Sequence, residues 1–89
     1  MESKIAEDLL NKIQETEKRD PDEIVPVIIT FEPNFRLDVS ALEQEGFDIK
    51  NKFSEINALA GTIPASGVKK LGERSDVKII EYDSKVYAF

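Results

Sequence analysis

The stretch VKIIEYDSKVYAF, residues 77–89, stands at the end of the chain and guides the interpretation of everything before it. Val77 and Ile79 alternate with Lys78, which predicts a strand beginning at Val77. The residues after Asp83 predict an extended tail, 84–89, that stops on an aromatic side chain. An apolar tail of this kind usually docks on its own core. It can instead lie in another protein's groove as an added strand, and the rest of the sequence has to distinguish the two.

Composition narrows the class of protein. With 89 residues, 40% hydrophobic and 34% charged, the chain is expected to form one globular domain that is a monomer when free. Its net charge of −6 argues against nucleic acid as a partner, since phosphate binding needs a basic surface. The absence of Cys and His excludes disulfides, the common zinc sites and imidazole acid–base chemistry, and we expect no cofactor. No apolar run is long enough to predict a membrane span, and no signal peptide is visible.

Periodicity and end signals predict the elements of the first half. An apolar stripe at helical spacing predicts a helix over residues 3–18, capped by Ser3. Alternation predicts a strand over residues 25–32, in which Pro26 should stand at the strand's start or on an edge. A second helix is expected over residues 35–45, capped by Asn34 and ended by Gly46.

The second half follows the same logic. Phe47, Ile49 and Phe53 alternate with polar residues, which predicts a half-exposed strand. The chain is expected to turn at residues 55–57, and the small residues of 58–63 predict a further strand. Pro64 opens a third helix, to about residue 74, that Gly67 and Gly72 weaken.

This order predicts an α+β, ferredoxin-like β-α-β-β-α-β fold, an antiparallel sheet with helices on one face, plus an extra N-terminal helix. The other sheet face is expected to stay open. It carries apolar residues, which suggests a surface for a protein partner.

Residues 25–89 resemble the subtilisin propeptide family, the inhibitor-type prodomains of subtilisin-like serine proteases and their free-standing inhibitor relatives. The matching features are, in order, VIITF at 27–31, a helix ending at Gly46, Phe53, NALAGT at 57–62, VKKL at 68–71, and VKIIEYD at 77–83 with an aromatic residue six positions after its aspartate. The resemblance divides the single domain, 1–89, into an extra N-terminal helix at 1–20, a propeptide-like core at 24–83 and an inhibitory tail at 84–89.

The resemblance implies a function and a set of contact residues. In that family the open sheet face packs on two parallel surface helices of the protease, and an acidic pair caps their N-termini. Here the pair would be Glu81 and Asp83, which is physically sound because helix N-termini favour carboxylates.

The tail of that family runs through the protease cleft like a product of self-cleavage. Phe89 would fill the primary specificity pocket, followed outward by Ala88, by Tyr87 pointing to solvent, and by Val86 in an apolar pocket. The implied function is an inhibitor, and an intramolecular-chaperone-type prodomain, that contributes no catalytic group. It would be secreted with its protease if an excised prodomain, and cytoplasmic if a free-standing inhibitor.

Other functions for this topology have less support. An acylphosphatase-like enzyme would need an Arg and an Asn in a phosphate-binding loop, and Arg36 and Asn34 match that arrangement poorly. An RNA-binding sheet would need exposed aromatic residues in basic surroundings, which the sequence lacks. We therefore expect no enzymatic activity. A regulatory or assembly domain with no protease partner remains the alternative.

Overall fold

The computed structural model describes residues 4–33 and 39–83. Its described elements are, in order, α1 (Glu7–Arg19), β1 (Ile24–Phe31), α2 (Val39–Gln44), β2 (Asp48–Phe53), β3 (Ala58–Pro64), α3 (Val68–Gly72) and β4 (Val77–Tyr82). Two 3-10 turns, η1 (Ser54–Ile56) and η2 (Ala65–Gly67), precede β3 and α3. The predicted Ser3 and Asn34 caps and the first residues of the predicted second helix lie outside the described residues.

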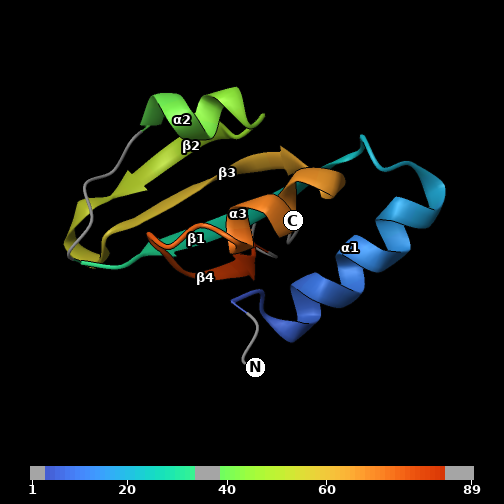
Figure 1. Ribbon diagram of the computed structural model, residues 1–89, viewed down its shortest axis with the longest axis horizontal. Coiled ribbons are helices and arrows are strands. Elements are labelled where there is room, and N and C mark those ends of the chain that lie inside the picture. The colour runs from blue at the N-terminus through green and yellow to red at the C-terminus, as the bar shows by residue number, and fades with distance from the viewer. Residues whose placement is uncertain (1–3, 34–38, 84–89) are drawn as a thin grey trace.

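The strands form one antiparallel sheet in the order β2-β3-β1-β4, so the chain has an α+β fold with an open four-stranded sheet (Figure 1). β1 is a central strand, although its third residue is Pro26. The carbonyl oxygen of Pro26 accepts a hydrogen bond from the N–H of Asp83, 3.1 Å away. In an antiparallel pair the N–H and C=O of one residue point the same way, so the missing N–H faces the region just past the end of β4. The proline therefore breaks no rung between the two named strands.

One face of the sheet builds the core. On β1 the side chains of Val25, Val27, Ile29 and Phe31 are all at most 2% exposed. They share a single apolar cluster with buried residues of all three described helices, among them Leu9 and Ile13 of α1, Leu42 of α2, and Val68 and Leu71 of α3. The helices of the described chain therefore cover the same face of the sheet, as the sequence predicts.

Two register shifts change which side chains face that core. In β2 the shift falls between Ile49 and Asn51, so Phe53 pairs with Ala58 and leaves the face that Ile49 occupies. The strict alternation predicted for Phe47, Ile49 and Phe53 is wrong for this reason, and Phe53 is 42% exposed. A second shift lies in the pairing of β1 with β4, beside Thr30 and Phe31. Because of it, Ile80 rather than Ile79 is buried on the same side of the sheet as Val77. An inserted residue reverses the in–out alternation of everything after it.

Two of the helices, α1 and α3, are shorter than predicted. α1 begins at Glu7, because Ile5 pairs with Ile80 as an isolated parallel β-bridge before the helix starts. Pro64 ends β3 instead of opening a helix, and α3 spans only Val68–Gly72 after the 3-10 turn. Two glycines within so short a segment disfavour a longer helix.

Two glycines occupy positions that other residues would strain, one because of its positive φ and one because of a close approach between strands. Gly46 has φ +94° directly after α2, where it ends the helix as predicted. At Gly61 a Cβ would overlap the backbone carbonyl oxygen of Asp48 and touch the ring of Phe47. Glycine at this position thus lets β2 and the Phe47 ring pack directly against β3.

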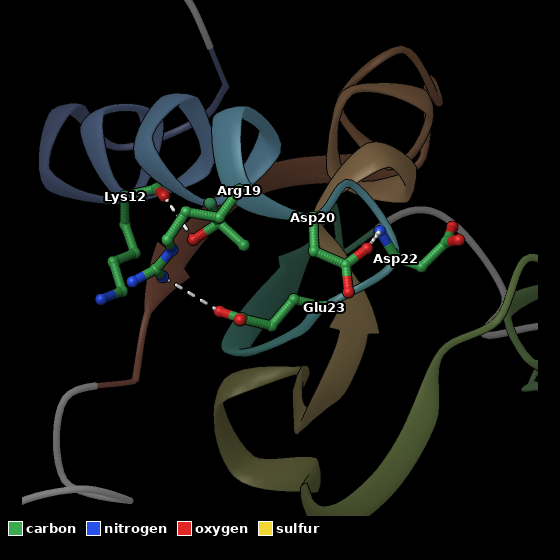
Figure 2. A network of polar contacts seen from close by, with 6 residues as sticks. Lys12, Arg19, Asp20, Asp22 and Glu23 are labelled. Atoms are coloured by element: carbon green, nitrogen blue, oxygen red, sulfur yellow. Dashed lines mark hydrogen bonds and ion pairs between the residues drawn. The ribbon is translucent and has the colours of Figure 1, made fainter.

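A tight turn connects α1 to β1. Thr16 is fully buried, and its hydroxyl donates to the carbonyl oxygen of Lys12 at 2.7 Å. Past the helix end, the Asp20 carboxylate accepts from the N–H of Asp22 at 3.0 Å. Figure 2 shows the guanidinium of Arg19 reaching over this turn to Glu23, with 3.1 Å between Nη2 and Oε2. Both side chains of that pair are well exposed, so the pair contributes little to the stability of the fold.

Candidate functional site

The sheet face opposite the core, which we call the open face, follows from the strand register. Ile28 of β1 is paired with Ala60 of β3 on one side and with Glu81 of β4 on the other. Thr30 is paired in the same way with Ala58 and Ile79. Side chains of directly paired residues lie on the same face of a sheet. None of these six residues belongs to the apolar cluster that the helices cover.

The centre of the open face carries small side chains. Ala60 lies between Ile28 and Asn51, and Ala58 lies between Thr30 and Phe53. Ala58 and Ala60 are only 1% and 4% exposed, so the larger side chains beside them, rather than the alanines, provide the surface that a partner could contact. The face is apolar along β1 and β3 and becomes acidic toward the end of β4.

Glu81 and Asp83 lie at that acidic end. Glu81 is exposed on the open face, opposite Ile28. Tyr82, between them, is paired with Val27 and packs against the core. Asp83 continues the strand pairing through its N–H bond to Pro26, so the alternation of the strand returns its side chain to the side of Glu81. The ion pairs found among the described residues involve neither carboxylate.

The predicted cleft-binding residues, Val86, Tyr87, Ala88 and Phe89, lie outside the described residues. The structure therefore brings together one part of the predicted site, the acidic pair and the open face, and leaves the tail a prediction. Residues 84–89 follow directly from the strand end that carries Glu81 and Asp83.

An apolar patch that the sequence pattern does not predict lies at one end of the open face. Phe53 and Ile56, 42% and 62% exposed, line a shallow groove together with Lys52, Ser54 and Glu55. Phe53 reaches this position because of the β2 register shift, which alternation alone does not reveal. Ile56 lies in the 3-10 turn η1, where the sequence pattern predicts only a turn.

An ion pair lies in the loop just before β4. Arg74 binds the carboxylate of Asp76 through two contacts, Nε to Oδ1 and Nη2 to Oδ2, both 3.0 Å. The hydrogen bonds from Arg74 hold the pKa of Asp76 below its usual value, although burial opposes this shift. Lys4 adds a favourable charge and donates from Nζ to the carbonyl oxygen of Arg74 at 2.6 Å. This cluster ties the N-terminal segment to the loop before β4.

No family model matches the chain, and no curated protein or solved structure is significantly similar to it. Within the described residues, no group of acidic side chains is arranged to hold a metal ion. None of the helices in that part of the chain is long and apolar enough to cross a membrane.

Proposed function

We propose that this protein inhibits a subtilisin-like serine protease, and acts as its intramolecular-chaperone-type prodomain, by docking with the open face and placing its C-terminal tail in the active-site cleft like a product. The observation that carries the proposal is that Glu81 and Asp83 lie on the side of the apolar open face, at the strand end that leads into residues 84–89. In the sequence, the tail begins at the residue that follows Asp83.

The topology supports the same proposal. The strand order β2-β3-β1-β4 and the helices on one face support a ferredoxin-like β-α-β-β-α-β arrangement. The subtilisin propeptide resemblance, which rests on residues 25–89, implies this arrangement. The extra N-terminal helix is the main departure from it.

The chemistry of the surface suits a pair of helices on the protease. Ile28 and Ile79 are partly exposed and would supply apolar contact, while the small, buried Ala58 and Ala60 add no bulk between the strands' larger side chains. Two carboxylates beside that surface would accept hydrogen bonds from unpaired N–H groups at the helix N-termini. Each such contact contributes about 0.3–1 kcal/mol, and more where it is partly buried.

The tail supplies the inhibition. Phe89 would occupy the primary specificity pocket and Val86 the apolar pocket further along, with Tyr87 and Ala88 between them. A product-like tail competes with substrate and brings no catalytic group, so the protein itself is not an enzyme. Because it would bind the folded protease preferentially, it would also stabilise that fold by mass action.

The test is titration of the protein into a subtilisin-type protease with a chromogenic peptide substrate. We expect competitive inhibition that Phe89→Asp weakens strongly. Ser40→Asp, which adds the same charge on the exposed side of α2, is the matched control and should inhibit like the unmodified chain. Several such proteases remaining fully active in excess protein would refute the proposal and favour the regulatory or assembly domain, for which loss of residues 86–89 makes no difference.

A further inference from the structure

The N-terminal segment is built into the sheet as well as into the helical layer. Ala6 donates from its N–H to the carbonyl oxygen of Ile80 at 2.9 Å, and the N–H of Ile80 donates to the carbonyl oxygen of Lys4 at 2.7 Å. Ile5, between them, forms a parallel bridge with Ile80. These bonds use the outer edge of β4, the edge that β1 leaves unpaired.

Side chains reinforce this attachment. Ile5 packs on the core and lies against Gly72 of α3, where an added Cβ would come within 3.3 Å of the Ile5 side chain. Lys4 reaches the loop before β4 through its bond to the carbonyl oxygen of Arg74. The start of the segment therefore holds β4 by backbone bonds, apolar packing and a charge-assisted hydrogen bond.

The other end of the segment is anchored as well. After α1, the carbonyl oxygens of Pro21 and Glu23 accept hydrogen bonds from Ser66 and Ala65, at 3.1 and 2.9 Å. Between these anchors, Leu9 and Ile13 are completely buried in the core. Residues 4–23 thus span from β4 across the helical layer to η2 and β1, as Figure 1 shows for α1.

We propose that residues 4–23 form an N-terminal clasp that holds the edge strand β4, and with it the Glu81 side of the open face, in place without any partner. Ile80 is held on both sides, because Ile29 pairs with it on one side and Ile5 on the other. A short edge strand that is hydrogen-bonded on one side only unfolds locally at little cost. A second set of hydrogen bonds on its outer edge raises the free energy of that local unfolding.

The consequence for inhibition rests on the proposed function. A binding surface that is already folded avoids the cost of ordering at the moment of binding, whereas a partly folded one binds more weakly in proportion to its folded fraction. The clasp therefore makes this domain a preorganised inhibitor, one that does not need its protease as a template for β4.

Proline scanning of two neighbouring positions in the full chain tests the clasp. Ala6 has φ −59° and ψ 146°, which proline adopts without strain, so Ala6→Pro removes the bond to Ile80 and leaves the local backbone conformation allowed. Glu7→Pro is the matched control, because proline is well tolerated at the first position of a helix. We expect Ala6→Pro to lower the thermal midpoint by about 5–15 °C relative to Glu7→Pro. The Ile80 amide should exchange with solvent at least about tenfold faster.

Inhibition provides a second readout. At a temperature where only about a tenth of Ala6→Pro is folded, its apparent inhibition constant should rise about tenfold. Trimethylamine N-oxide, which favours the compact state, should largely restore it. Failure of Ala6→Pro to fold at all would support the clasp, provided Glu7→Pro folds.

Three results would overturn or redirect the inference. Equal melting of the two variants with an unchanged Ile80 exchange rate would refute the clasp. Weakened inhibition by an Ala6→Pro protein of normal stability would also refute it, because residue 6 would then be acting on the protease directly. A full chain that inhibits no protease would refute the proposed function, while melting and amide exchange would still decide the clasp.

Discussion

Substitutions of Asn57 test how the turn between β2 and β3 is held, because its backbone and side chain contribute separately. The backbone lies in the left-handed region, with φ 54° and ψ 47°. The side-chain Nδ2 donates to the carbonyl oxygens of Phe31 and Glu32, at 3.1 and 3.2 Å. In return, the N–H of Phe31 donates to the carbonyl oxygen of Asn57 at 2.9 Å. One residue therefore fixes the turn and the end of β1.

The expected cost separates into two parts. Each side-chain hydrogen bond contributes about 0.5–1.5 kcal/mol, and a left-handed conformation costs alanine about 1–2 kcal/mol. Asn57→Ala loses both side-chain bonds and strains the turn, so it should destabilise the fold by about 2–5 kcal/mol, which lowers the thermal midpoint by at least roughly 10 °C. Asn57→Gly loses the bonds but adopts the conformation freely, so it should be more stable than Asn57→Ala by about 1 kcal/mol.

Urea denaturation followed by far-UV circular dichroism measures these differences, with equal slopes as evidence that the unfolding process is unchanged. Asn57→Asp is the third variant, since it keeps the shape and tolerates the left-handed region but turns acceptor oxygens toward two carbonyl oxygens. It should be less stable than Asn57→Gly. An Asn57→Gly protein within about 0.5 kcal/mol of the original chain would show that the side-chain bonds contribute almost nothing, and the reasoning would be wrong.

Three further predictions follow from the contacts described above. Gly61→Ala should destabilise the fold by at least about 1–3 kcal/mol in the same urea assay, because the added carbon has no room between β2 and β3; unchanged stability would show that the strands separate freely. The pKa of Asp76 is lowered by Arg74, so its contribution is present above the unfolded pKa of about 3.9 and is lost as pH falls through the folded value. Asp76→Asn should therefore be less stable at pH 7 and lose less stability between pH 5 and pH 3 than the original chain; parallel pH curves would contradict this. Glu81→Gln with Asp83→Asn should weaken inhibition about 3- to 30-fold at low salt and less at high salt, if each carboxylate interacts with a helix N-terminus; an inhibition constant that does not change would remove the capping role.

The sequence predicted the order of elements because the strongest local signals agree with the tertiary structure. β1 and β4 carry apolar runs that only a sheet buries well, and β4 begins at Val77 as expected. Gly46 ends α2 with the positive φ that the pattern implied. The placement of Glu81 on the open face follows from pairing with Ile28.

The register shifts could not be predicted, because nothing in the local pattern distinguishes an inserted residue from continued alternation. Lys50 and Lys78 are ordinary polar residues in a half-buried strand, yet the shifts beside them redirect Phe53 and Ile79 to the open face. The bridge at Ile5 was hidden for another reason. Its spacing from Leu9 fits a helix, and only the unpaired edge of β4 makes an extended conformation more favourable there.

The two edges of the sheet are protected by different means, and the difference explains why the chain needs its N-terminal segment. β2, at one edge, carries Asp48, Lys50 and Lys52, all exposed, and its register shift interrupts regular pairing. Charge and a bulge are sufficient to discourage a second strand from adding to such an edge.

β4, at the other edge, also has a register shift, beside Lys78, but its centre carries two consecutive apolar residues, Ile79 and Ile80. Left bare, this apolar edge would pair with other chains as readily as with its own. Residues 4–6 occupy the N–H and C=O of Ile80. Loss of the clasp should therefore promote aggregation as well as unfolding, and light scattering of Ala6→Pro at rising concentration should show this before Glu7→Pro does. Equal scattering by the two variants at matched unfolded fractions would mean that the β4 edge is harmless and that the clasp serves stability alone.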